Sequence, residues 1–407
     1  MTATAHLVTV GAMPAAGADG AAVADALAAE GITLASRVFI EDDEAALERA
    51  LGYDDALTVV LAGGGGSAGD SVRRVLARAT GTRLVLNERA LAALQERYRR
   101  LDRPLPRRAE RLALLPQGAT VWVADDGESG WALVTGSRAF AVLARDASVK
   151  AMIEQHLSPF AQAWASGRGT TLVRTLRTAG LGLADVEERL ADWLGPDGEV
   201  TVSTVPADGE VWVRLRARAS TPAEAARSAA KTDAAISAIL GDDCYGREGE
   251  TLEGVVARLL IERKLTLAVA ESCTGGLLSH RLTSVPGSSA YFERGVLAYS
   301  DRAKKDLLGV PASVLRAPGA VSAEGAEAMA RGVAALAGTP CGLAIAGIAG
   351  PDGGTPARPV GTIFVGLVVK GEALARRFHF AGERAAVKWQ ATQAALDMLR
   401  RGLGARP

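Results

Sequence analysis

The sequence predicts an α/β protein built from three parts, and two observations indicate this class. Apolar strand-like runs alternate with helix-like runs at the start of the chain, and the same alternation returns after residue 250. Between these parts, from about residue 170, the order is strand, helix, strand pair and long helix. Alternating strands and helices are typical of a largely parallel sheet covered by helices, in three layers. We therefore expect two three-layer α/β domains, at residues 1–168 and 250–407, and a small α+β unit at residues 169–246.

The first part contains three strand-helix pairs. The apolar runs 6–12, 32–39 and 56–61 predict strands, and the segments 21–30, 43–51 and 72–79 predict helices. The glycine-rich turn 62–70 favours a flexible connection over a phosphate site, because no hydroxyl or basic group is placed to help. The Pro/Arg-rich segment 103–108 favours a solvated loop over contact with an acidic partner. Short strands are expected at 119–123, 131–135 and 139–143.

The middle and last parts have their own order of elements. In the middle part we expect strands at 171–179, 200–205 and 210–218, helices at 184–194 and 222–240, and a linker at 241–250. In the last part we expect helices at 251–263, 277–285, 302–308, 323–336 and 385–399, and strands at 265–270, 291–299, 342–346, 360–369 and 373–380.

Composition limits the classes of function. The chain has 407 residues, of which 48% are hydrophobic and 23% are charged, as in globular proteins. Its 46 basic residues equal its 46 acidic ones, so the overall charge does not indicate a nucleic-acid or membrane partner. The three cysteines, Cys244, Cys273 and Cys341, fit neither a disulfide framework nor zinc-ligand spacing. With no long apolar segment, the sequence predicts a cytoplasmic protein without export or membrane anchoring.

The turn at 270–276 (AESCTGG) connects a buried strand to a helix. Hydroxyls, free backbone N–H groups and paired glycines at such a turn suit an anion. The same glycines would equally serve a tight connection. The turn alone therefore leaves both interpretations open.

Lys304 is a candidate base. Serine needs a base to become a nucleophile, and His280 and His379 lie in no recognisable triad. If Ser300 caps the helix, Lys304 lies in its first turn, where the dipole opposes a cation and lowers the lysine pKa. The alternative is a surface lysine with its amine in water. A second glycine-rich loop, 346–354, follows a strand end and suggests backbone packed against a flat or anionic group.

Six segments in residues 250–402 together resemble the C-terminal domain of the CinA family, which includes the stand-alone nicotinamide-nucleotide amidohydrolase. They are 270–276 (AESCTGG), 282–290 (LTSVPGSSA), 298–304 (AYSDRAK), 319–322 (GAVS), 347–354 (GIAGPDGG) and 359–362 (PVGT). The preceding residues resemble the rest of that family: a molybdopterin-cofactor-binding-like domain and a KH-like unit.

The resemblance implies deamidation of nicotinamide mononucleotide by a Ser/Lys dyad, with no metal and no other cofactor. Carried onto this chain, it makes Lys304 the base and Ser289 the preferred nucleophile, with Ser272 as the competing candidate. Tyr299 would orient the lysine or stabilise the oxyanion. The substrate would be held by Glu271, Thr274, Gly275, Gly276, Gly347, Gly350, Thr362 and Arg384, of which Arg384 suits a phosphate.

The chain departs from the family pattern in both α/β domains. Ala346 stands where the family has Thr or Ser, which removes one hydroxyl contact to substrate. In the first domain the family's acidic and hydroxyl motifs become 11–13 (GAM), 62–68 (AGGGGSA) with Asp70, and 143–147 (LARDA). The ADP-ribose pyrophosphatase activity of the family's first domain is therefore expected to be absent here.

A non-catalytic role in competence or DNA damage is the alternative, with nucleic acid or a recombination protein as the partner. Its sequence feature is Arg214, Arg216 and Arg218, which alternate along a predicted strand and share one side. Neighbouring Glu210 and the neutral net charge argue against strong nucleic-acid binding. The family also implies a homodimer.

Overall fold

The computed structural model describes residues 3–11, 18–41, 43–62, 66–124, 128–144, 146, 148–195, 199–207 and 209–404. The chain packs into two compact units. One comprises Met1–Val173, Asp197–Val200 and Arg216–Lys231, and the other comprises Arg174–Pro196, Thr201–Leu215 and Thr232–Pro407. No helix in the described part is both long and apolar enough to cross a membrane.

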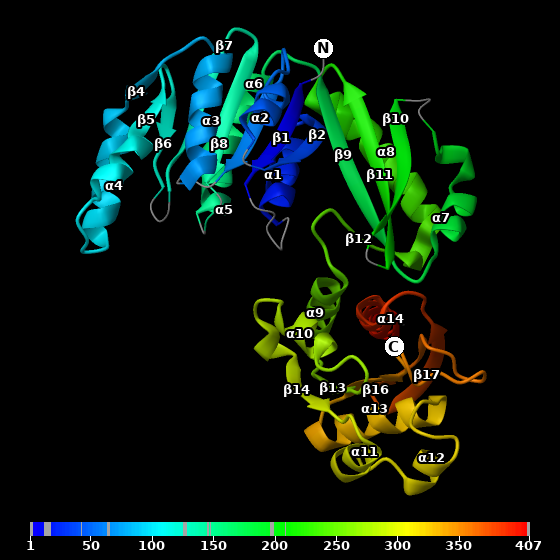
Figure 1. Ribbon diagram of the computed structural model, residues 1–407. Coiled ribbons are helices and arrows are strands. Elements are labelled where there is room, and N and C mark those ends of the chain that lie inside the picture. The colour runs from blue at the N-terminus through cyan, green and yellow to red at the C-terminus, as the bar shows by residue number, and fades with distance from the viewer. Residues whose placement is uncertain are drawn as a thin grey trace. The chain divides into compact units, whose positions relative to one another are not determined.

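The N-terminal α/β domain contains a six-stranded sheet of order β2-β1-β3-β8-β7-β6 (Figure 1). Its strands are β1 (Thr4–Val10), β2 (Thr33–Ile40), β3 (Leu57–Ala62), β6 (Thr120–Trp122), β7 (Gly130–Thr135) and β8 (Arg138–Ala144). β1, β2, β3 and β8 are parallel, whereas β7 and β6 extend the sheet antiparallel. One apolar core lies on each face, as the predicted three layers require.

The remaining elements of this domain are mainly helices. They are α1 (Ala18–Ala29), α2 (Glu44–Ala50), α3 (Gly66–Ala79), α4 (Glu88–Arg100), the 3₁₀ helix η1 (Arg107–Ala113), α5 (Val149–Met152), the π-helix η2 (Ile153–Leu157) and α6 (Ser158–Ala165), with the strand pair β4 (Leu84–Leu86) and β5 (Leu114–Pro116). Helix α4, the β4–β5 pair and the helices of 149–165 were not predicted from the sequence.

The middle part has a four-stranded sheet of order β10-β11-β9-β12. Its elements are β9 (Thr170–Thr178), α7 (Leu183–Arg189), η3 (Ala191–Trp193), β10 (Val200–Ala207), β11 (Glu210–Ala219), α8 (Pro222–Leu240), η4 (Gly241–Asp243) and β12 (Cys244–Arg247). The expected linker at 241–250 therefore contains a strand, which pairs antiparallel with β9. These four residues form a strand because they pair with β9, although their local sequence does not predict one.

The C-terminal domain has a five-stranded sheet of order β14-β13-β15-β16-β17. Its elements are α9 (Leu252–Glu262), β13 (Leu267–Glu271), α10 (Leu277–Thr283), η5 (Ser288–Ala290), β14 (Phe292–Leu297), α11 (Asp301–Leu308), α12 (Ala312–Arg316), α13 (Ala323–Ala337), β15 (Cys341–Gly347), β16 (Thr362–Val369), β17 (Glu372–His379) and α14 (Arg384–Gly404). One apolar core lies against α9, α10 and α14, and another against α11 and α13 (Figure 1). This arrangement confirms the predicted three layers.

The last helix, α14, is held by buried polar contacts. Gln393 Nε2 donates a hydrogen bond of 2.7 Å to Glu210 Oε1, and the Gln393 side-chain oxygen accepts one from Arg281. Arg400 donates to the carbonyl oxygen of Asp242, and Arg401 to the carboxylate of Asp243. These contacts join α14 to residues of the middle part within the same compact unit.

Candidate active site

The predicted site residues gather mainly at one edge of the C-terminal sheet. β13 runs parallel to both neighbours, so that Glu271 lies opposite Leu297 on one side and Ile345 on the other. β16 runs antiparallel and begins at this edge, where Ile363 pairs with Gly347. The segments after β13, β14 and β15 therefore meet beside the start of β16. In open α/β sheets this carboxyl edge is where ligands bind.

Lys304 is buried at this edge, with only 4% of its side chain exposed. Ser300 caps α11 by accepting a hydrogen bond from the Ala303 N–H, which confirms the predicted cap. The Lys304 amine donates a hydrogen bond of 2.7 Å to the carbonyl oxygen of Tyr299 and lies 4.0 Å from an Asp301 carboxylate oxygen. The interpretation of Lys304 as a solvated surface lysine is therefore wrong.

Burial lowers the pKa of the Lys304 amine below the ordinary lysine value, because the charged form loses hydration. The carboxylate of Asp301 and the nearby Cys273 thiol group act in the opposite direction. Asp301 is 63% exposed, so water screens its effect. Desolvation is the largest influence, and it favours the neutral amine that a general base requires.

The structure brings Ser272 to Lys304's edge of the sheet and does not bring Ser289 there. Ser272 directly follows β13, and its N–H bonds to the carbonyl oxygen of Ile345. Tyr299, whose carbonyl holds the lysine, follows the neighbouring strand, and adjacent strands lie about 4.8 Å apart. Ser272 is therefore the candidate nucleophile whose position suits Lys304.

Ser289 lies in η5, before the first residue of β14. Lys304 lies after the last residue of the same strand, and β14 extends for about 16 Å between its end Cα atoms at about 3.3 Å per residue. The expected Ser289–Lys304 pair is therefore not formed within one chain. In the described part of the chain, no hydrogen bond joins Lys304 to either serine.

Tyr299 acts on the lysine through its backbone. Its side chain is 62% exposed, and it is the carbonyl oxygen that accepts the hydrogen bond from Lys304. Tyr299 therefore positions the lysine through its carbonyl oxygen, and a role of its hydroxyl at the oxyanion stays a prediction.

The Glu271 carboxylate accepts its hydrogen bonds from groups of the protein itself. Its side chain is 1% exposed, and its carboxylate accepts hydrogen bonds from the N–H groups of Gly276, Leu278 and Ser279 and from the Ser279 hydroxyl, at 2.7–3.1 Å. A carboxylate here accepts hydrogen bonds from the N–H groups at the start of α10, and its negative charge interacts favourably with the positive end of the helix dipole. The expectation that Glu271 contacts substrate is therefore replaced by a structural role.

The turn after Glu271 needs its two glycines. Gly275 and Gly276 have φ angles of +66° and +96°, which side chains other than glycine rarely adopt. Gly347 is required for a different reason, since a Cβ there would lie 2.7 Å from the carbonyl oxygen of Thr362. These glycines shape the crevice whether or not they touch a ligand.

Two threonines at this edge have unsatisfied hydroxyls. Thr274 and Thr362 are fully buried, and neither side-chain oxygen has a hydrogen-bond partner among the residues that the structure describes. A buried hydroxyl without a partner is unfavourable by about 1–3 kcal/mol. Both threonines are among the residues expected to hold substrate, and each retains unused hydrogen-bonding capacity.

A pocket of about 900 Å³ opens beside this edge, between the 349–351 loop and the start of α14. Arg384 and Lys388 both line it, one helical turn apart. Arg384 Nη1 donates a hydrogen bond of 2.7 Å to the carbonyl oxygen of Gly350. A Cβ at Gly275 would lie 3.5 Å from Lys388 Nζ, so Lys388 reaches the glycine turn.

Two cations in this pocket have no carboxylate partner. Among the described residues, neither Arg384 nor Lys388 forms an ion pair with a carboxylate, although the carboxylate-bearing Glu383 also lines the pocket. The two cations outnumber this one acidic residue, and an excess of positive charge suits a phosphate. Lys388 was not predicted as a site residue, although it lies on the helix expected at 385–399, four residues after Arg384.

The substituted motifs of the N-terminal domain lie partly outside the described residues, which omit 12–17, 63–65, 145 and 147. Asp70 is described, and its carboxylate pairs with Arg73 and Arg111. Across the described ranges, no three His, Cys, Asp or Glu side chains cluster in a way that would hold a metal ion.

The predicted arginine face of β11 is present. Val213, Leu215 and Ala217 are buried on one side of the strand, while Arg214 and Arg216 are half-buried and Arg218 is exposed. This alternation confirms that the three arginines share a side. A surface with one well-exposed arginine provides little of the charge that nucleic-acid binding needs.

The fold and the site define an α/β protein with a KH-like middle part and a buried lysine at the carboxyl edge of its C-terminal sheet. Three family models match the chain: a probable molybdopterin binding domain over residues 10–163, a damage-inducible protein CinA KH domain over 173–246 and a CinA C-terminal domain over 249–403. The chain belongs to the CinA family.

Two relatives match nearly the whole chain. A putative competence-damage inducible protein of Moorella thermoacetica is 40% identical over 388 residues, covering 93% of each chain. A CinA-like protein of Geobacter sulfurreducens is 39% identical over 392 residues, covering 95% of this chain and 94% of its own. A crystal structure of a CinA superfamily protein from Klebsiella pneumoniae is 37% identical, covers 38% of this chain and 97% of its own, and has a TM-score of 0.37.

Proposed function

We propose that the C-terminal domain hydrolyses the carboxamide of nicotinamide mononucleotide, giving nicotinate mononucleotide and ammonia. The observation that carries the proposal is the buried Lys304 amine, which lies at the same sheet edge as Ser272. A nearby pocket lined by Arg384 and Lys388, which form no ion pair within the described part of the chain, supports a substrate that carries a phosphate.

The proposed reaction proceeds in two stages. The neutral Lys304 amine takes the proton from Ser272 Oγ as this oxygen attacks the carboxamide carbon. The lysine then returns the proton to the leaving nitrogen, so that ammonia departs and an ester with Ser272 remains. Water attacks the ester, Lys304 takes its proton and passes it back to Ser272 Oγ, and nicotinate mononucleotide is released.

The proposed binding mode follows from the charges. The substrate phosphate lies against Arg384 and Lys388, because these two cations line the pocket without carboxylate partners. The carboxamide then extends toward the Thr274 and Thr362 hydroxyls, for which the described residues supply no hydrogen-bond partner. The expected homodimer stays a prediction.

The test is ammonia release from nicotinamide mononucleotide by the purified full chain, with nicotinate mononucleotide measured by chromatography. Lys304→Ala should lower kcat by about 10²-fold or more, the usual contribution of a general base. Lys305→Ala is the matched control, because Lys305 is the exposed neighbour on the same helix. Undiminished turnover by Lys304→Ala, or no ammonia from the unmodified chain, would contradict the proposal.

A further inference from the structure

A buried carboxylate, Glu210, connects the middle part of the chain to the last helix. Glu210 is the first residue of β11 and is 8% exposed. It accepts hydrogen bonds of 2.7–2.8 Å from the Trp212 indole N–H, the Tyr245 hydroxyl and the Gln393 amide. Arg177 lies 3.7 Å away. Trp212 and Tyr245 belong to the middle part and Gln393 to α14, so one carboxylate fixes α14 relative to the KH-like sheet.

The Gln393 amide also contacts α10. Its nitrogen donates to Glu210 and its oxygen accepts a hydrogen bond from Arg281, so both polar ends are used. A reversed amide would turn its N–H groups toward the Arg281 guanidinium and its oxygen toward the Glu210 carboxylate, and both hydrogen bonds would be lost. The orientation of Gln393 is therefore determined from both sides.

Arg281 holds α10 against α14. Its side chain is 4% exposed, and besides Gln393 it donates hydrogen bonds to Thr392 Oγ1 at 2.8 Å and to Glu253 Oε2 at 2.6 Å. Its guanidinium lies 4.3 Å from the centroid of the Trp389 ring. Residues 389, 392 and 393 share one face of α14, because they are three and four positions apart. One buried cation therefore contacts a full turn of this helix.

Both helices lead to the candidate active site. Leu277, the first residue of α10, lines the pocket together with Arg384 and Lys388 of α14. Arg281 lies one turn after Leu277, and Ser272 lies in the turn that leads into α10. The contacts of Arg281 therefore set the distance between the cations proposed to bind the phosphate and the proposed nucleophile.

We propose that Glu210, Gln393 and Arg281 are positioning residues that hold the phosphate pocket at a fixed distance from the reacting serine. The proposal rests on the proposed amidohydrolase function and extends its site into the KH-like part. These residues act by keeping α10 and α14 at one separation and one rotation. A nucleotide whose phosphate is bound by the two cations of α14 then has its carboxamide beside Ser272.

The preference for a substrate with a phosphate measures this alignment. It is the ratio of kcat/KM for nicotinamide mononucleotide to kcat/KM for nicotinamide riboside. A smaller folded fraction lowers both values equally and leaves the ratio unchanged. A misplacement of about 1 Å can lower a rate by up to about 10²-fold, so Gln393→Leu, which keeps a similar volume, should lower the ratio about tenfold. Glu210→Ala, which removes the acceptor of Gln393, should lower it in the same direction.

Arg401→Gln is the matched control. Arg401 also joins α14 to the middle part, through Asp243. It lies about 20 Å along the helix from Lys388, whereas Gln393 lies about 8 Å from it, at about 1.5 Å per residue. Arg401→Gln should lower the melting temperature and keep the phosphate preference. An unchanged ratio in Gln393→Leu, or an equal fall in both variants, overturns the proposal.

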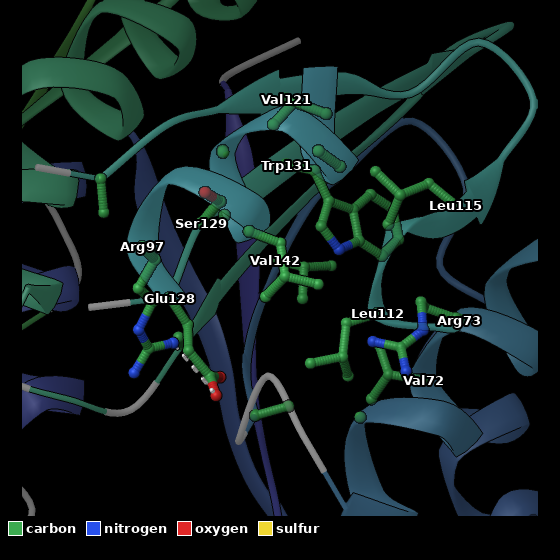
Figure 2. Close-up of a pocket in the computed structure, with 18 residues that line it drawn as sticks. Val72, Arg73, Arg97, Leu112, Leu115, Val121, Glu128, Ser129, Trp131 and Val142 are labelled. Carbon is green, nitrogen blue, oxygen red and sulfur yellow. Dashed lines mark ion pairs between the residues drawn. The ribbon is translucent and has the colours of Figure 1, made fainter. Parts of the chain in front are cut away.

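A second control lies in the other compact unit. Arg97 pairs with Glu128 at 3.7 Å beside a pocket of the N-terminal domain (Figure 2). All residues that line this pocket belong to the first unit, whereas Glu210, Gln393 and Arg281 belong to the second. Arg97→Gln should therefore leave the phosphate preference unchanged.

Binding of nicotinate mononucleotide, measured by titration calorimetry on the full chain, separates this proposal from the amidohydrolase because it needs no turnover. Gln393→Leu should weaken this binding and Arg401→Gln should not. If that pattern appears but the unmodified chain releases no ammonia, the amidohydrolase fails and the positioning role stands. If ammonia is released with the same phosphate preference in every variant, the positioning role fails and the amidohydrolase stands. An unmodified chain that neither binds the nucleotide nor releases ammonia contradicts both.

Discussion

The Lys304 amine donates a hydrogen bond of 2.7 Å to the carbonyl oxygen of Tyr299. This contact fixes the amine beyond the end of β14, next to β13, the strand that Ser272 directly follows. A carbonyl acceptor holds the amine without adding a full negative charge, so burial remains the main influence on the lysine pKa. The site thus keeps its lysine in place while favouring the uncharged form.

The two candidate serines should differ sharply in their effect on rate. We expect Ser272→Ala to lower kcat for nicotinamide mononucleotide by about 10²-fold or more, because it removes the attacking oxygen. Ser289→Ala should change kcat less than about threefold, since Ser289 lies at the opposite end of β14. Steady-state assays of both variants decide the assignment, and the reverse pattern would make Ser289 the nucleophile.

The pH dependence should report Lys304. Only the neutral amine accepts a proton, so kcat/KM should rise with pH through a midpoint below the ordinary lysine value of about 10.4. Asp301 opposes this lowering, so Asp301→Asn should move the midpoint to lower pH and raise the rate at neutral pH. Asp306→Asn, on the same helix, should leave the midpoint unchanged. If Asp301→Asn leaves the midpoint of the pH profile unchanged, this electrostatic explanation is contradicted.

The two cations of α14 should act on binding more than on chemistry. Arg384→Gln and Lys388→Gln should each raise KM for nicotinamide mononucleotide about tenfold and alter kcat by less than about threefold, because they contact a phosphate that does not react. Nicotinamide riboside, which lacks the phosphate, should respond little to either change. Arg376→Gln on the exposed strand β17 is the control. Equal losses with the nucleotide and the riboside would exclude a phosphate contact.

Glu271 should matter for stability. Glu271→Gln places a donor amide where a carboxylate now accepts hydrogen bonds from Gly276, Leu278 and Ser279. We expect a loss of about 2–3 kcal/mol, the usual value for a buried charged acceptor. Hydrogen exchange at the Leu278 amide and thermal melting measure this effect. Ser279→Ala, which removes one hydroxyl donor, should lose about 1 kcal/mol, and an equally stable Glu271→Gln variant would contradict the capping role.

Strand-helix alternation predicted both α/β sheets, because buried parallel strands have continuous apolar runs that stand out from amphipathic helices. The helix α4 has no buried residue, but Leu91, Leu94 and Tyr98 recur at helical spacing, so the local pattern did contain this helix. β12 is a strand only because β9 lies beside it. Such a strand depends on tertiary contacts that a local pattern does not contain.

The positions of the two serines relative to Lys304 could be predicted from the order of the strands. Ser289 precedes a predicted strand and Lys304 follows it, and residues on either side of one strand lie at opposite ends of it. Ser272 and Lys304 both follow strands that a crossover makes parallel, so they share an edge. The role of Glu271 was not predictable in this way, because its hydrogen bonds depend on how its side chain turns back toward α10.

The contacts that hold α14 affect the stability of a truncated chain. A truncated protein that begins at residue 250 would lack Glu210, Asp242 and Asp243, which are partners of the last helix. Gln393, Arg400 and Arg401 would then face solvent beside apolar side chains. Helix α14, which carries Arg384, would keep its contacts with the sheet but lose its hydrogen bonds to the middle part. The isolated fragment should therefore unfold at a lower temperature than the intact polypeptide.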